Sequence, residues 1–317
     1  PRRPAPMRGL MLRFLLSRLV TTVPVLFGVS LLVFMMLHLV PGDPVKMMLS
    51  EFQTTPQQVE LLRSQLHLDE PLPQQYGRFV VNALRGDLGL SIRSKRPVRN
   101  EIGENLGSTL QLAAAALLIA IGIGMPLGII AALKQHSWFD IGPMIFALSG
   151  VSMPSFWLGL LLIFLFSLRL GWFPATGGGD LKHLILPALT LGLGASAIIA
   201  RLTRSSMLEV LRQDYMTTAR AKGLNETIVV LRHGLKNALI PVVTIFGLQF
   251  GSLLAGAVVV ETVFARPGIG RLIVNSILAK DFPMVQGIIL FTATAYVVAN
   301  LLVDLAYGLL DPRIRIG

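Results

Sequence analysis

The sequence of 317 residues contains no cysteine, which excludes disulfide bonds and thiolate metal ligands. Its histidines are few, and no two of them stand at the spacing of a metal site. They are His38, His67, His136, His183 and His233. We therefore expect neither a metal centre nor another cofactor.

Charged residues are also scarce, at 14% of the chain against 53% hydrophobic residues. A soluble domain of this length needs far more charged surface, so the composition indicates an integral membrane protein. The net charge of +11 and the pI of about 10.7 would suggest nucleic-acid binding in a soluble protein. In a membrane protein, cytoplasmic loops that face anionic lipid explain the same balance, so we expect no nucleic-acid partner.

Signatures of catalysis are missing as well. The pattern G-x-x-x-x-G-K-[ST] does not occur, so the chain has no recognisable nucleotide site. Residues 268–270 read Gly-Ile-Gly, but no Lys-Ser/Thr follows and no strand precedes, which favours an outer turn. Ser149, Ser152 and Ser155 have no histidine at matching depth in a neighbouring span, which argues against an intramembrane protease. We expect a protein that is not an enzyme.

Long apolar runs predict an all-α membrane protein with six transmembrane helices. The first run is longer than the core of a cleaved signal peptide, so we expect a signal-anchor with the N-terminus inside. The predicted parts are a cytoplasmic leader (1–18), a first helix (19–40), a small extracytoplasmic subdomain (41–105), a transmembrane core (106–310) and a cytoplasmic tail (311–317). Within the core we expect helices at about 112–133, 141–168, 184–200, 238–260 and 284–310, and a cytoplasmic loop at 206–237.

Six crossings place both termini in the cytoplasm. The basic run from Arg93 to Arg99 then falls on the outer side, against the positive-inside tendency, which is weak for long loops. An ion-coupled transporter normally carries ionisable residues near the middle of the membrane. Only Asp304 lies clearly inside a predicted span, near its cytoplasmic end, so a secondary transporter is the weaker alternative.

Small and polar residues mark positions inside the spans. Gly124 and Gly128 have the small-xxx-small spacing that lets helix backbones approach closely. The third apolar run is interrupted by serines and a proline, which are tolerated at this depth when they are buried in protein or line a cavity. A simple proline kink and a translocation pathway both fit this interruption. The pathway candidates are Ser149, Ser152, Pro154, Gln249 and Asn300.

The longest polar stretch of the C-terminal half runs from Arg212 to Pro241. We expect a helix from Met207 to Ala221 that ends at Gly223, because glycine suits the left-handed position after a helix. Asn225 can cap a second helix that runs into the next span. Small residues would let the first helix press into a groove on another protein; they are Thr217, Thr218, Ala219 and Ala221. An ordinary basic loop between two membrane helices is the alternative.

The run from Thr217 to Gly223 resembles the EAA loop of ABC-importer membrane subunits. The general pattern is Glu-Ala-Ala, three residues and Gly, and here Thr217 and Thr218 replace the Glu and the first Ala. The peptide branch of the family instead has D-Y-x-x-T-A-R-A-K-G followed by H-x-L-[KR]-N-A-x-x-P, which residues 214–223 and 233–241 match. Further segments that resemble this branch lie at 41–44, 68–72, 86–92, 152–159, 261–271 and 281–283.

The resemblance extends from Arg18 to Arg313 and implies a permease subunit of an ATP-driven importer in the bacterial inner membrane. It implies dipeptides or oligopeptides as substrates, with nickel chelates or glutathione as alternatives. The implied partners are a second permease in a heterodimer, two cytoplasmic ATPase domains that hydrolyse ATP, and an extracytoplasmic solute-binding protein. The implied ATPase-coupling residues are Asp214, Tyr215, Thr217, Thr218, Ala219, Arg220, Ala221, Lys222, Gly223 and Glu226.

Overall fold

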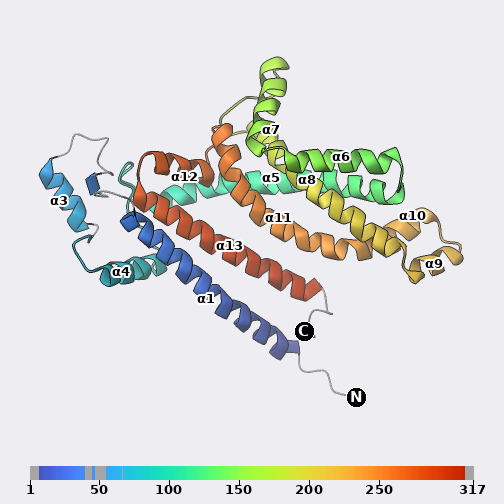
Figure 1. Cartoon of the computed structure of the whole chain (residues 1–317), viewed down its shortest axis with the longest axis horizontal. Helices are drawn as coiled ribbons and strands as arrows, with labels where there is room; N and C mark the ends of the chain where they lie inside the picture. The colour runs from blue at the N-terminus through green and yellow to red at the C-terminus, as the bar shows by residue number, and fades with distance from the viewer. Residues whose placement is uncertain (1–6, 40–44, 47–54, 66, 311–317) are drawn as a thin grey trace. The chain divides into compact units, whose positions relative to one another are not determined.

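The computed structural model of the chain describes residues 7–39, 45–46, 55–65 and 67–310 (Figure 1). The family-like segment at 41–44, the tail at 311–317 and the side chain of Asp304 lie outside what is described. Helices make up nearly all of the described chain, and its only extended pairing is an isolated bridge between Leu90 and Pro97. The predicted all-α class is confirmed.

Within the described residues, five helices are long and apolar enough to cross a membrane, and a sixth span results if one bent helix pair counts as one. The five helices are Val20–Leu39 within α1 (Met7–Leu39), α5 (Val98–Leu133), α8 (Lys182–Leu211), Pro241–Val263 within α11 (Lys236–Val263) and Phe282–Leu301 within α13 (Phe282–Leu310). The bent pair begins with α6 (Trp138–Ser152) and continues with α7 (Ser155–Leu162). The chain divides into two compact units. Unit 1 comprises residues 1–107 and 272–301, and unit 2 comprises residues 108–271 and 302–317.

In unit 2, α8 lies at the centre of the core and packs against α5 and α11. Buried alanines and leucines from all three helices form one cluster, which includes Ala116, Leu191 and Ala257. A Cβ at Gly124 would lie 2.4 Å from the carbonyl oxygen of Ser196, which confirms the predicted close approach of two helix backbones. Gly128 makes a similar contact with the backbone of α8.

The third apolar run is broken sharply. Helix α6 (Trp138–Ser152) is followed by α7 (Ser155–Leu162) and a π-helix, η1 (Ile163–Arg169), and the two halves of the run meet at 105°. Pro154 cannot donate a backbone hydrogen bond and disfavours the helical conformation at Met153, which is extended (φ −80°, ψ 126°). A bend of this size separates two helices, so it exceeds a simple proline kink.

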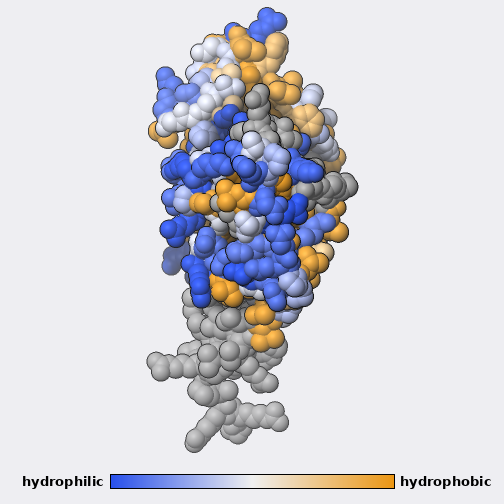
Figure 2. Space-filling model, turned by 90° about the vertical axis from the view of Figure 1, so that its left-hand side faces the viewer, coloured by the Kyte–Doolittle hydropathy of each residue, from blue (hydrophilic) through white to orange (hydrophobic). Residues whose placement is uncertain are grey.

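Unit 1 pairs α1 with α13, because Gln286 of α13 donates a hydrogen bond to the carbonyl oxygen of Val33 at 3.0 Å. Helices α3 (Pro56–Gln65) and α4 (Leu72–Leu84) follow α1, and α12 (Ile269–Leu278) precedes α13. Figure 2 shows the side on which α3 and α4 are drawn, and its surface is mostly hydrophilic. Exposed Gln57, Gln58 and Glu60 of α3 fit this character.

The predicted continuous helix from Met207 to Ala221 is wrong. Helix α8 ends at Leu211, Gln213 is extended (φ −75°, ψ 147°), and α9 (Asp214–Ala221) begins a new direction. Because the chain changes direction here, α9 buries the side chain of Met216. In a continued α8 this side chain would stay exposed. Burial of this apolar side chain stabilises the turn more than one further helical hydrogen bond would.

Candidate functional site

The polar stretch after α8 folds into a compact helical segment of unit 2. Helix α9 ends at Lys222, and Gly223 has φ +75°, which confirms the left-handed position predicted for it. The side chain of Asn225 accepts a hydrogen bond from the Thr227 N–H at 2.9 Å, so the predicted cap is confirmed. The short α10 (Glu226–Ile228) continues into a π-helix, η2 (Val229–Leu235), which joins α11.

One face of α9 is buried within the chain itself. Met216 and Ala219 pack with Val229 of η2 and with the end of α8, and Ala219 is only 7% exposed. The expectation that Ala219 meets another protein is therefore corrected, because its side chain faces the interior of this segment. The opposite face of α9 is exposed and carries Thr217, Thr218 and Ala221.

Polar contacts connect the parts of the segment. The guanidinium group of Arg220 donates to the carboxylate of Glu226 at 2.9 and 3.1 Å, which joins α9 to α10. This hydrogen bond lowers the pKa of Glu226 and raises the pKa of Arg220. Asn237, at the start of α11, donates to the hydroxyl group of Tyr215 at 2.9 Å. The candidate coupling residues Asp214 to Glu226 thus belong to one folded element, which we call the α9–η2 segment (residues 214–235).

The exposed surface of the α9–η2 segment combines small and apolar side chains. Large apolar groups in contact with solvent are Tyr215, Leu224, Ile228 and Leu231, which are between 38% and 53% exposed. Our sequence analysis missed the last three, although their spacing of four and three residues in a polar stretch is typical of one helix face. A contiguous apolar patch would be typical of a surface that another molecule covers, so these side chains add to the candidate site.

The neighbouring end of α8 is fixed by an ion pair. Arg204 donates to both carboxylate oxygens of Asp140, at 2.5 and 2.8 Å, and Asp140 also accepts the His136 N–H at 3.1 Å. These bonds tie the start of α6 to α8. A groove of about 460 Å³ beside them is lined by Arg204, Ser205, Leu208, Glu209, Arg212 and Gln213.

The break between α6 and α7 forms a second groove, of about 520 Å³, lined by Ser149, Ser152, Met153, Pro154, Phe156 and Trp157. The structure therefore brings together three of the five pathway candidates. The hydroxyl group of Ser152 donates to the carbonyl oxygen of Leu148 at 3.0 Å and stays exposed. Hydroxyl, thioether and aromatic groups give this groove a mixed polar and apolar lining.

The other two candidates lie elsewhere. Gln249 is buried in α11, at 8% exposure, and does not line the groove. Asn300 is half-buried on α13, in unit 1. The geometry thus supports the serine and proline candidates as one group and leaves Gln249 and Asn300 as separate positions.

A buried carboxylate was missed by the sequence analysis. Glu261 is fully buried near the end of α11, where it accepts a hydrogen bond from the hydroxyl group of Thr109 at 2.6 Å. It also accepts the N–H groups of Gly270 and Arg271 at the start of α12, at 2.8 and 3.2 Å. A helix N-terminus favours an anion, so the residues around Gly270 hold an internal carboxylate. A Cβ at Gly270 would lie 2.3 Å from the backbone of Val258, so only glycine fits there.

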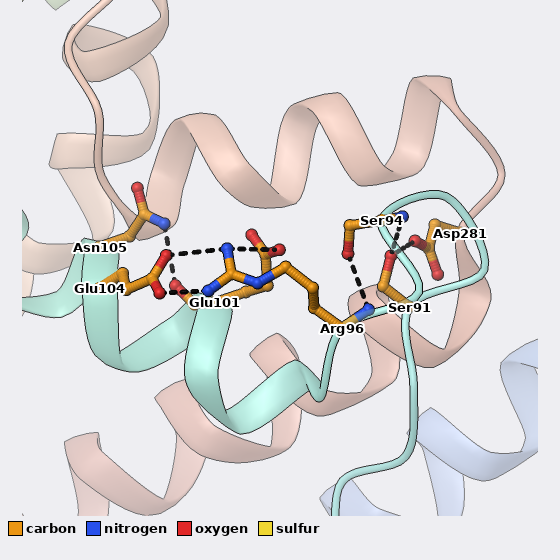
Figure 3. A network of polar contacts seen from close by, with 7 residues as sticks. All are labelled: Ser91, Ser94, Arg96, Glu101, Glu104, Asn105 and Asp281. Carbon is orange, nitrogen blue, oxygen red and sulfur yellow. Dashed lines mark hydrogen bonds and ion pairs between the residues drawn. The ribbon is translucent and has the colours of Figure 1, made fainter.

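A second carboxylate organises a hairpin in unit 1 (Figure 3). Asp281 accepts the hydroxyl group of Ser91 at 2.5 Å and the N–H groups of Ile92 and Arg93 at 3.2 and 3.3 Å. Figure 3 also shows Arg96 reaching Glu101 and Glu104 on the first turns of α5. These bonds fix the hairpin between Leu90 and Pro97 against the start of α13.

Comparison with protein families agrees with this architecture. A family described as "Binding-protein-dependent transport system inner membrane component" matches residues 124–316. Its N-terminal companion, described as "Binding-prot-dependent transport system membrane comp, N-term", matches residues 11–113. The chain belongs to this family of transport-system membrane components. The predicted family is therefore confirmed.

Individual relatives support the same assignment for the permease. It is 48% identical over 305 residues to the glutathione transport system permease protein GsiC of Escherichia coli strain K12, with 96% of this chain and 99% of the relative covered. The same protein of Shigella flexneri serotype 5b (strain 8401) matches equally well. In its fold, the permease is similar to an inward-facing structure of the MetNI methionine ABC transporter, with a TM-score of 0.58 and 16% identity over 67% of this chain and 96% of that one.

The permease is thus a multi-pass inner-membrane subunit of an ABC importer. Such a subunit works with ATPase subunits and a substrate-binding protein, and it is a transport component and not an enzyme. The predicted function is confirmed at this level.

Proposed function

We propose that the permease passes short peptides, glutathione included, from a solute-binding protein into the cytoplasm. The proposal rests on the 48% identity to a glutathione transport system permease, which extends over 96% of this chain and 99% of the relative. Glutathione is itself a tripeptide, so it fits the peptide class that the sequence motifs indicate. A pathway for such substrates needs groups for both amide and apolar parts.

The groove at the α6–α7 break is a candidate part of this pathway. Ser149 and Ser152 offer hydroxyl groups, while Phe156 and Trp157 offer aromatic surface. Trp157, which lines this groove, is 43% exposed. A second, homologous permease would supply the opposite wall, so we propose a heterodimer in which Gln249 and Asn300 line further parts of the shared pathway.

The α9–η2 segment is the candidate coupling element. Its buried face anchors it to α8, and its exposed residues include small side chains of α9 and the apolar groups of Leu224, Ile228 and Leu231. We propose that an ATPase subunit covers this face, and that the basic residues of the segment keep it in the cytoplasm. Movement of the ATPase would then pull on α8 and α11, which flank the segment in the chain.

Uptake by the reconstituted complex tests the substrate. Proteoliposomes that contain both permeases and the ATPases, with enclosed ATP and external binding protein, should accumulate labelled glutathione. Unlabelled short peptides should compete, and free amino acids should not. Vesicles without ATP are the matched control. Accumulation driven by an ion gradient without ATP, or competition by free amino acids alone, would contradict the proposal.

A further inference from the structure

Helix α4 packs one face against the membrane-spanning part of α1. The hydroxyl groups of Tyr76 and Ser30 lie 2.9 Å apart, and the Tyr76 ring meets Phe34 edge-on at 5.4 Å. The ring of Phe79 lies 5.9 Å from the ring of Phe34. Both helices belong to unit 1, and Figure 1 shows α4 beside α1. These aromatic contacts fix which face of α4 is turned towards α1.

The contacts reach deep into the span. Ser30 lies roughly 13 Å along the helix axis from Leu39, the last described residue of α1, at 1.5 Å per residue. The ring of Tyr76 packs against this apolar part of α1, and its hydroxyl group pairs with that of Ser30. The backbone of α4 therefore runs beside the same part of α1, since the tyrosine side chain is short.

The opposite side of α4 carries two exposed aliphatic side chains among exposed polar ones. Val81 is 45% exposed and Leu84 is 83% exposed, and their spacing of three residues places them on one side of the helix. Exposed Arg78 and Arg85 stand next to this flank, and Arg78 pairs with Glu70 at 2.8 Å. An aliphatic stripe bordered by arginine is typical of a helix that lies in a membrane interface.

We propose that Val81 and Leu84 insert between the acyl chains of phospholipids, so that α4 anchors the segment after α1 to the bilayer surface. Continuity favours lipid as the occupant, because the exposed side chains of α1 beside α4 are also apolar, among them Phe27, Leu31 and Leu32. Arg85 then lies at the level of the phosphate groups, where its long side chain can reach them. The leaflet into which α4 inserts depends on the proposed orientation of the protein. The insertion itself does not depend on that orientation.

Anchoring of α4 would also fix the position of the residues that precede it. Gln75 of α4 donates to the carbonyl oxygens of Leu68 and Glu70 at 3.2 and 2.7 Å, and its own oxygen lies 3.1 Å from a ring nitrogen of His38. The chain between α3 and α4 is therefore fixed to α1 through the same helix. A lipid-anchored α4 holds this subdomain at a set height above the bilayer.

Spin labelling of the complete transporter in phospholipid nanodiscs tests the insertion. The chain has no cysteine, so Leu84→Cys or Val81→Cys introduces a unique labelling position in it, and the parent complex supplies the background. The nitroxide should collide with oxygen far more often than with a water-soluble nickel chelate. Leu32→Cys in α1 is the lipid-exposed reference and should give the same order. Gln57→Cys in the polar α3 is the control and should give the opposite order.

Three results would overturn the proposal. A nickel-chelate collision rate at Leu84→Cys equal to that at Gln57→Cys would place the flank in water. Low rates with both reagents would mean that another protein covers it. In a Leu84→Asp background, the label at Val81→Cys should become several times more accessible to the chelate, and unchanged accessibility would also contradict lipid insertion. The spin-label measurement does not depend on glutathione uptake. It therefore separates failure of the proposed anchor from failure of the proposed substrate.

Discussion

Glu261 shows how a charge is held inside the membrane component. Its carboxylate has three hydrogen-bond donors, and two of them are backbone N–H groups at the start of α12. Arg266 lies nearby at 4% exposure, and burial lowers the pKa of its guanidinium group while Glu261 opposes this effect. A buried charge needs such partners because its desolvation is costly.

Replacing this carboxylate should destabilise the permease. Glu261→Ala would leave the Thr109 hydroxyl group and two buried N–H groups without their acceptor and would remove the negative charge near Arg266, at a cost of roughly 3–5 kcal/mol. We expect a clear fall in the thermal unfolding midpoint of the purified complex. Glu226→Ala is the matched control, because Glu226 is exposed and its surface pair with Arg220 contributes little. Equal midpoints for the two variants would show that the Glu261 cluster does not stabilise the fold.

Residues differ in how far the sequence alone predicts their role. Gly223 and Asn225 were predicted correctly, because a helix end and a cap depend on the adjacent backbone. Glu261 was missed because its hydroxyl partner, Thr109, lies on a distant part of the chain. The orientation of Ala219 was also missed, because it depends on a turn at Gln213 that no local signal marks.

At the scale of elements, breaks between helices position the candidate site. The turn at Gln213 directs Met216 and Ala219 inwards and Ala221 outwards. The Pro154 break creates the groove at Ser149 and Ser152. The proline interruption was visible in the sequence, whereas the bend of 105° depends on how α7 packs against α8 and α11.

Two alanines of α9 give opposite expectations for the same substitution. Ala221→Arg places a long charged side chain on the exposed face, so it should leave the thermal midpoint unchanged and abolish the ATPase activity that binding protein and substrate stimulate. Ala219→Arg forces a charge among Met216 and Val229 and should lower the midpoint. Arginine is a good helix former, so helix propensity does not explain either effect. The measurements are ATPase assays and thermal melts of the reconstituted complex.

A failure of this prediction has a clear form. Normal stimulation in a stable Ala221→Arg complex would mean that the exposed face of α9 does not meet the ATPase. A loss of stimulation by Ala219→Arg together with unfolding carries no information on docking, which is why the exposed alanine is the decisive position.

At the scale of the whole molecule, hydropathy predicted the class of the fold because each apolar run must fill the bilayer with its own hydrogen-bonded helix. The bent pair α6–α7 counts as one crossing only if both halves lie in the membrane, and then the total is six. An even total puts both termini on one side. Charge alone decides the side weakly, because the basic run from Arg93 to Arg99 falls in a long loop.

Thiol labelling of intact cells tests this orientation. Gln57→Cys and Ser94→Cys lie on exposed parts of unit 1 that we place outside, and Thr217→Cys lies on the exposed face of α9 that we place inside. With the outer envelope permeabilised, a membrane-impermeant maleimide should label the first two positions at once. It should label Thr217→Cys only after the inner membrane is broken, since the ATPase requires α9 on the ATP side. Immediate labelling of Thr217→Cys, with Gln57→Cys protected until lysis, would reverse the topology and remove the basis for coupling through α9.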